Sequence, residues 1–233
     1  MERILDLLAV LAVGLGIGPY NPHFNELTYE IAQHSVVLKI KGTQGDWLGA
    51  GSVIEIHGVP GILTAWHVTE AASIQDLDLE ACWVVDLTDC IDLPFDAVIT
   101  AASDSLAGDW SIHILKEVPI YWSSAQLRSR AAVVGEEVYR VGVPAGNPGL
   151  FSYGIVTGFA DEGGDIILTD AFAFYGSSGG GLFDKRGRLL GITVAIMDWD
   201  GPIGEINYSV PITPVRALRN WPLSGYLQLD LSG

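Results

Sequence analysis

Residues 176–180 read Gly-Ser-Ser-Gly-Gly, a turn of small residues with Ser178 at its centre. A serine hydroxyl can act as a nucleophile when it lies at an exposed tip, with room for a substrate carbonyl and free backbone N–H groups beside it. Glycines on both sides permit this, because they have no side chain and adopt positive φ angles freely. The alternative for such a stretch is a Gly/Ser loop without catalytic function, so the rest of the chain must decide.

The order of residues along the chain limits the choices for this serine. The turn also fits the G-x-S-x-G pattern of α/β-hydrolases, in which the catalytic histidine follows the serine. Here all five histidines precede Ser178, namely His23, His34, His57, His67 and His113. The α/β-hydrolase interpretation is therefore excluded, and the order His, Asp, Ser remains.

His67 is the histidine with the most informative surroundings. Residues 63–68 read Leu-Thr-Ala-Trp-His-Val, so an apolar strand ends in this histidine. A lone histidine is usually a hydrogen-bonded structural residue, but here the serine turn provides a second, independent motif. His57 lies in a Gly/Pro turn and His113 alternates along a strand, so both fit surface or packing roles better.

Asp109 is the candidate for the acidic partner. Residues 109–115 read Asp-Trp-Ser-Ile-His-Ile-Leu, an alternating segment that begins directly at the aspartate. Asp96 and Asp104 are the competitors, but neither begins such a segment. The sequence thus offers His67, Asp109 and Ser178 in the order that a His-Asp-Ser triad requires.

Composition favours one core-rich, all-β unit. The chain has 233 residues, of which 49% are hydrophobic, 17% are charged and 28 are glycines. Such a composition suits short strands joined by glycine turns, and all-β proteins of this length commonly form one unit. Apolar runs between Gly, Pro and Asp predict strands at 35–40, 51–56, 62–65, 81–85, 97–100, 110–115, 137–143, 154–159, 165–168, 181–183, 189–196 and 206–211.

Two strand-rich halves follow from these runs. We expect a helix-like stretch at 27–33, a first barrel at about 33–117, a polar linker at 118–130 and a second barrel at about 131–213. A closing helix is expected at 213–221 and a final strand at 226–231, within a C-terminal tail of 214–233.

These motifs together resemble the serine proteases of the trypsin/chymotrypsin fold, most closely the protease domain of the HtrA/Deg branch. Residues 63–67 are similar to its Thr-Ala-Ala-His signature, and 109–115 to its Asp-Leu-Ala-Val-Leu pattern. Further similarities lie at 48–54 (Leu-Gly-Ala-Gly-Ser-Val-Ile), 139–144, 154–156, 169–171 and 208–212. The resemblance spans about 27–219 and implies two six-stranded antiparallel β-barrels with short N- and C-terminal helices, with no PDZ domain expected after them.

The resemblance also implies functions for individual residues. His67 would be the general base, Asp109 its orienting partner and Ser178 the nucleophile of a serine endopeptidase, with the Gly176 and Ser178 N–H groups as the oxyanion hole. The substrate backbone would pair with Ile192, Thr193 and Val194. Phe172 and Ile206 would line the specificity pocket, which predicts rejection of Lys and Arg and a preference for small or medium aliphatic residues before the scissile bond. Ser177 departs from the Asn or Asp usual before the nucleophile, so an inserted N-terminal ammonium would find no acidic receiver there.

The expected partners are protein or peptide substrates, without a cofactor or a metal. A formal charge of -16 opposes binding to nucleic acid, and no CxxC or HExxH spacing indicates a metal site. The other function considered is that of an inert binding or assembly protein that keeps this fold without triad geometry. Labelling by a fluorophosphonate probe distinguishes the two.

Two features stay open at the level of sequence. The cysteines Cys82 and Cys90 could bridge a hairpin that turns near 86–89, or could be two free buried thiols. Residues 1–24 form an apolar, helix-like segment, whose apolar run at 4–18 is interrupted by Asp6 and is shorter than the roughly 20 residues of a membrane span. We therefore expect it to pack on the domain or on a second copy rather than cross a membrane, with export or membrane attachment as the alternatives.

Overall fold

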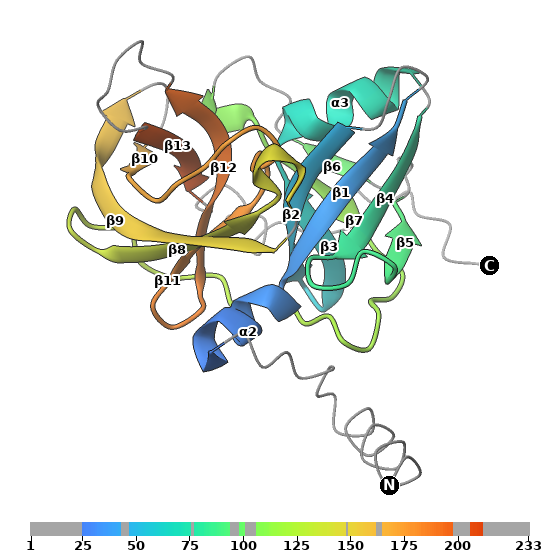
Figure 1. Ribbon diagram of the computed structural model, residues 1–233, viewed down its shortest axis with the longest axis horizontal. Helices are drawn as coiled ribbons and strands as arrows, with labels where there is room; N and C mark the ends of the chain where they lie inside the picture. Colours follow the sequence, from blue (N-terminus) through green and yellow to red (C-terminus); the bar gives the residue numbers. More distant parts are fainter. Residues whose placement is uncertain are drawn as a thin grey trace, which may run out of the picture.

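The computed structural model describes residues 25–42, 47–75, 77–93, 98–100, 106–147, 149–161, 165–197 and 206–211. These residues form two antiparallel β-structures that lie side by side (Figure 1). The predicted segment at 1–24 and the predicted closing helix and strand at 213–231 fall outside the described residues.

The first structure is a seven-stranded sheet in the order β5-β4-β1-β2-β3-β7-β6. Its strands are β1 (Ser35–Lys41), β2 (Trp47–Ile56), β3 (Val59–Thr64), β4 (Asp78–Trp83), β5 (Cys90–Asp92), β6 (Val98–Thr100) and β7 (Ser111–Ile114). Neighbouring strands alternate in direction, and β2, β3 and β7 are consecutive in the sheet. Their side chains supply much of the core, including Val53, Ile54, Ile62, Leu63 and Ile112.

The second structure is a closed six-stranded barrel in the order β10-β13-β12-β11-β8-β9. Its strands are β8 (Glu137–Gly142), β9 (Leu150–Asp161), β10 (Asp165–Thr169), β11 (Gly181–Asp184), β12 (Leu189–Met197) and β13 (Ile206–Pro211). Closure leaves this sheet without free edges, so every strand has a partner on both sides. A bulge between Thr193 and Ala195 interrupts the pairing of β12 with β13.

The predicted all-β, trypsin-like fold class is confirmed, with two differences in the first unit: among the described residues it is an open sheet rather than a closed barrel, and it has seven strands rather than six. The closed barrel has the six strands expected, but the first sheet has seven, because the short strand β5 adds to the edge of β4. Within the described residues, β5 and β6 are the two ends of this sheet. β5 has the sequence Cys-Ile-Asp and so, unlike the apolar run at 97–100 that contains β6, offers no apolar run from which a strand could be predicted.

Two helices flank the first sheet. The helix α2 (Glu26–Gln33) matches the predicted helix at 27–33, and its N-cap Asn25 accepts a hydrogen bond from the Thr28 N–H. The helix α3 (Trp66–Gln75) was not expected; Ile74 near its end is 75% exposed, so its apolar residues do not form one buried face. Among the described residues, no helix is both long and apolar enough to cross a bilayer.

The stretch expected as a polar linker at 118–130 is a packed crossing between the two sheets. Trp122, Ala125 and Leu127 are buried, and the Ala125 N–H donates to Val53 O at 2.8 Å. Arg128 is also buried, and its guanidinium makes paired hydrogen bonds with the carboxylate of Glu136. This segment therefore helps to hold the two β-structures together.

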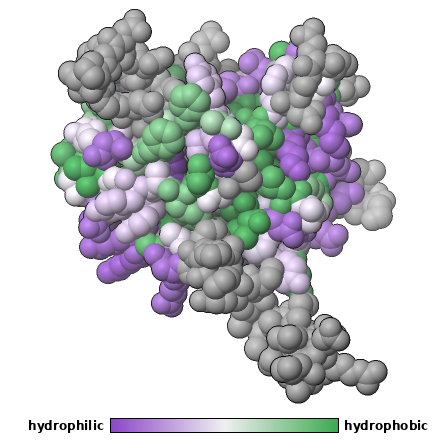
Figure 2. Space-filling model, viewed as in Figure 1, coloured by the Kyte–Doolittle hydropathy of each residue, from purple (hydrophilic) through white to green (hydrophobic). Residues whose placement is uncertain are grey.

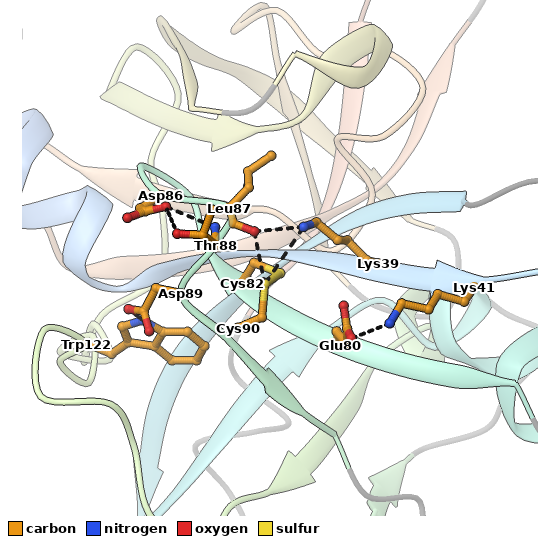
Figure 3. The surroundings of a disulfide bond; sticks show 10 residues. All are labelled: Lys39, Lys41, Glu80, Cys82, Asp86, Leu87, Thr88, Asp89, Cys90 and Trp122. Atoms are coloured by element: carbon orange, nitrogen blue, oxygen red, sulfur yellow. Dashed lines mark hydrogen bonds and ion pairs between the residues drawn. A yellow bond between two sulfur atoms is a disulfide. The ribbon is translucent and has the colours of Figure 1, made fainter.

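Cys82 and Cys90 form a disulfide between β4 and β5 (Figure 3). The two residues face each other directly in the antiparallel register, which is the arrangement that brings their sulfurs together. Lys39 on β1 donates to Leu87 O at 2.9 Å and so ties the connecting turn to the sheet. The disulfide thus closes a short loop at the edge of the first sheet.

We expect the double substitution Cys82→Ser/Cys90→Ser to lower the free energy of unfolding by about 2–3 kcal/mol. Opening a loop of this length returns conformational entropy to the unfolded chain, which the disulfide otherwise removes. Urea unfolding measures the change. A reductant should lower the wild-type midpoint to that of the variant and leave the variant unchanged; a wild-type midpoint insensitive to the reductant would contradict the expectation.

Candidate active site

His67 and Asp109 are brought together by the pairing of β3 with β7. Thr64 at the end of β3 is opposite Ser111 at the start of β7, so the residues just after β3 and just before β7 lie at the same edge of the sheet. His67 follows in the first turn of α3, and Asp109 follows the 3-10 turn Leu106–Gly108. The register of two strands therefore positions both side chains.

The Asp109 carboxylate binds His67 through both of its oxygens. Asp109 Oδ2 lies 2.6 Å from His67 Nδ1, and Oδ1 accepts the His67 backbone N–H at 2.9 Å. The carboxylate side chain is only 15% exposed, whereas the imidazole side chain is 43% exposed. Because an ionised carboxylate only accepts hydrogen bonds, Nδ1 is the donor in this contact, and in a neutral imidazole Nε2 is then the acceptor.

Ser178 lies in the loop 170–180, which connects β10 to β11 and is held by both β-structures. The Ala50 N–H of β2 donates to Ser178 O at 2.8 Å, and the Gly179 N–H donates to Thr193 O of β12 at 2.7 Å. Gly179 has a φ of +81°, and a Cβ atom there would lie 2.1 Å from Thr64 Oγ1. Only glycine fits at this position, because any side chain would clash with the end of β3.

The backbone N–H groups of Gly176 and Ser178 are available to a ligand. Gly176 has a φ of +95°, and within the described part of the chain neither of these N–H groups donates a hydrogen bond. Ser177 between them is buried; its hydroxyl accepts the Phe174 N–H at 3.2 Å, and its own N–H donates to Phe174 O at 2.8 Å. Ser177 thus holds the loop from inside while its neighbours face the cleft.

His67, Ser178 and Gly176 line one cleft of about 610 Å³. Trp47, Leu48 and Tyr175 are among its other walls. Apolar residues gather where the two β-structures meet on the face shown in Figure 2. Between the described residues Ser178 and His67, no hydrogen bond joins the hydroxyl to the imidazole. The cleft can therefore hold an apolar ligand against a hydroxyl, an imidazole and two N–H donors.

The residues predicted to bind substrate lie in different surroundings, some exposed and some buried. Phe172 is 51% exposed and lines a second, smaller cavity beside the loop 170–180. Ile192 and Thr193 are buried in β12, and the Thr193 N–H donates to Gly180 O while its carbonyl accepts from Gly179. The Thr193 backbone groups are thus used within the protein, and the pairing of a substrate with β12 stays a prediction. The side chain of Ile206 lies outside the described part of the structure.

Arg140 is a residue of this region that is not among those predicted from the sequence. It lies on β8, is 1% exposed, and lines the same small cavity as Phe172. A signal for it exists in the sequence, because Val138 and Arg140 are two residues apart on a strand and must share one face. Val138 is fully buried, so the same period places a cation inside the barrel.

The chain is similar to known proteins over most of its length. The model of the trypsin-like peptidase domain matches residues 49–192. The chain is 30% identical over 184 residues to Protease Do-like 1, chloroplastic, of Arabidopsis thaliana, covering 73% of this chain and 38% of that protein. It is 32% identical over 194 residues to the Putative serine protease HhoA of Synechocystis sp., covering 76% of this chain and 43% of that protein.

Two further matches are more distant. The Periplasmic serine endoprotease DegP of Salmonella typhimurium is 27% identical over 186 residues, which cover 77% of this chain and 37% of that protein. The crystal structure of the serine endoprotease from Yersinia pestis superposes with a TM-score of 0.62 at 20% identity, covering 85% of this chain and 68% of that one, and so shows the fold alone.

The chain spans less than half the length of these curated relatives. The predicted similarity to HtrA/Deg proteases is nevertheless confirmed by relatives that carry these names, and the matched domain model covers more than half of the chain. The chain therefore belongs to the trypsin-like peptidase family.

Proposed function

We propose that this chain is a serine endopeptidase whose triad consists of His67, Asp109 and Ser178. The observation that carries the proposal is the pair of hydrogen bonds between Asp109 and His67 at the edge of a cleft that Ser178 also lines. Membership in a family of peptidases supports the same reaction class. The order of the three residues along the chain is that of the chymotrypsin arrangement.

The first half of the reaction uses the groups already described. Ser178 Oγ attacks the carbonyl carbon of the scissile peptide bond, and its proton moves to His67 Nε2. Asp109 keeps the proton on Nδ1 and stabilises the imidazolium that forms. The oxyanion is stabilised by the Gly176 and Ser178 N–H groups, where one such donor contributes about 2.7–4 kcal/mol to lowering the barrier.

The second half regenerates the enzyme. The C–N bond breaks as His67 gives its proton to the leaving amine, and an acyl-enzyme ester on Ser178 remains. Water then attacks this ester, with His67 accepting the water proton and returning it to Ser178 Oγ. Substrate in the cleft would displace water and shorten the Ser178–His67 distance, as is common when catalytic hydrogen bonds form only in the complex.

The substrate preference expected from the sequence has two parts. Rejection of Lys and Arg side chains is supported by Arg140, because a second cation beside a buried guanidinium would be repelled. The preference for aliphatic residues rests on Phe172 and Ile206 and stays a prediction. A preference for acidic residues competes with it, because Arg140 lines the same cavity as Phe172.

The acyl-enzyme gives the test of this proposal. We expect a p-nitrophenyl ester to release a rapid burst of about one equivalent of p-nitrophenol per protein chain, followed by a slower steady rate, because acylation precedes hydrolysis. Stopped-flow absorbance measures the burst. The inert binding or assembly protein with this fold would give neither the burst nor a steady rate above the background, and that result would contradict the proposal.

A further inference from the structure

A second cavity, of about 90 Å³, adjoins the loop 170–180 on the side of Ser177. Its walls include Arg140 and Gly142 of β8, Ser152 of β9, and Phe172 and Ser177 of the loop. We call it the Arg140 cavity. Because about 10–15 Å³ of such space suffices for one water molecule, the cavity has room for a carboxylate group.

Arg140 reaches this cavity as a buried cation whose hydrogen bonds all go to neutral groups. Nη1 donates to Ala171 O at 2.8 Å. Nη2 donates to Thr169 Oγ1 at 3.0 Å and to Ser209 Oγ at 3.2 Å. Nε is buried and has no hydrogen-bond partner. Arg140 makes no ion pair with any carboxylate in the described ranges of the chain.

Arg128, the other fully buried arginine among the described residues, has an anionic partner for its charge. Arg128 binds Glu136 through both nitrogens of its fork, with 2.9 Å between Nη2 and Oε2, and Asp184 lies 3.9 Å away. Buried cations in proteins are normally paired in this way, because an unpaired buried charge is strongly destabilising. Arg140 has the burial of Arg128 without its anion.

The charge on Arg140 persists at neutral pH. Burial lowers the pKa of Arg140 to about 9, which is still well above 7. The guanidinium beside the cavity therefore keeps its positive charge at neutral pH, and its Nε is a buried donor without a partner. Both features match a carboxylate, which binds guanidinium groups through charge-assisted hydrogen bonds.

The groups that hold Arg140 connect it to the proposed substrate site. Ala171 directly precedes Phe172, and Ser209 on β13 is opposite Thr193 on β12. Ser177, which shares the cavity with Arg140, directly precedes Ser178. The cation thus lies where β8, β10, β13 and the loop 170–180 meet, and it shares the small cavity with Phe172, one of the residues predicted to line the specificity pocket.

We propose that the Arg140 cavity binds a carboxylate, and that Arg140 selects substrates with Asp or Glu before the scissile bond. This inference rests on the proposed endopeptidase function and names its substrate class. The overall charge of -16 would repel acidic peptides at long range, but the screening length at physiological salt is about 8 Å. Contact with Arg140 is shorter than that and is little screened.

The first test compares peptides that differ only in the residue before the scissile bond. We expect kcat/KM for Glu or Asp to exceed that for Leu, Ala and Lys by about tenfold or more, as one charge-assisted hydrogen bond allows. Arg140→Gln keeps a polar, uncharged side chain in the barrel but removes the positive charge, so it should abolish the preference. Arg130→Gln, the same change on a side chain that is 65% exposed, should leave the preference in place. Wild-type protein that cleaves after Leu at least as fast as after Glu would overturn the assignment of Arg140 to substrate selection.

The second test does not depend on activity. Acetate at 100 mM should raise the Tm of the Ser178→Ala protein relative to chloride at the same ionic strength, and Arg140→Gln should remove this shift. In the active protein, acetate should compete with a Glu substrate. If acetate instead accelerates cleavage after neutral residues, the carboxylate site stands and its ligand is a free carboxylate rather than a substrate side chain.

The two proposals can fail separately. An acetate-dependent Tm shift without any peptide cleavage would leave the Arg140 site standing and refute the endopeptidase function. Peptide cleavage without an acidic preference and without an acetate-dependent Tm shift would support the endopeptidase function and overturn the carboxylate site.

Discussion

Ser178→Ala is expected to lower kcat by about a million-fold while leaving the free energy of unfolding nearly unchanged. The loss is this large because the hydroxyl is the only nucleophile proposed, and removing one member of a triad disables the others. The fold should tolerate the change, since the Ser178 contacts that hold the loop 170–180 use its backbone carbonyl rather than its side chain. Peptide hydrolysis and urea unfolding of the same preparation measure both effects.

Ser177→Ala is the matched control for this substitution. It removes the same atom from the neighbouring residue, whose hydroxyl accepts the Phe174 N–H inside the loop. We expect a loss of about 1 kcal/mol in stability and a change of less than tenfold in kcat/KM. The opposite order of effects, with Ser177→Ala the inactive protein, would place the nucleophile one residue earlier.

Asp109→Asn is expected to lower kcat by about ten-thousand-fold. The carboxylate accepts the His67 Nδ1 proton at 2.6 Å, whereas an amide nitrogen in its place would donate and favour the tautomer with the proton on Nε2. His67 could then no longer accept the proton of Ser178. The same Asp-to-Asn change in the chymotrypsin triad lowers kcat by about ten-thousand-fold. Steady-state kinetics near neutral pH measures the loss.

Asp170→Asn provides the control for a general loss of negative charge. Asp170 is exposed, and its Oδ1 accepts the Ile155 N–H at 2.6 Å, a contact that an asparagine oxygen can keep. We expect kcat within about threefold of wild type. Equal losses for the two variants would argue against a specific function of Asp109.

Much of the region around the site could be predicted because its motifs are local. The segments that end in His67 and begin at Asp109 lie next to strands with clear apolar alternation, and the strand register then brings them within hydrogen-bond distance. The serine turn could also be recognised from the sequence, because its glycines are conspicuous there. The structure explains them: positive φ angles and close contacts leave no room for a Cβ atom at these positions. The local sequence therefore predicts the motifs, and the pairing of the strands determines how close their side chains lie.

The remaining features depend on contacts that local patterns do not encode. The disulfide could not be decided from spacing, because it depends on the direct pairing of Cys82 with Cys90 across β4 and β5. The helix α3 has no single apolar face, and the stretch 118–130 is polar in sequence yet packs Trp122 and Leu127 into the core. A charged residue in a strand is expected at the surface, and this expectation outweighs the two-residue spacing between Val138 and Arg140 until the closed barrel shows both side chains buried.

The central claim, that Ser178 is a nucleophile activated by His67, is tested most directly by locating a fluorophosphonate label. The wild-type protein should carry one label, on the peptide that contains Ser178, as determined by mass spectrometry after digestion. Ser178→Ala and His67→Ala should carry none above background, whereas Ser177→Ala should be labelled like wild type. A wild-type protein that stays unlabelled, or a label on any residue other than Ser178, would contradict the claim.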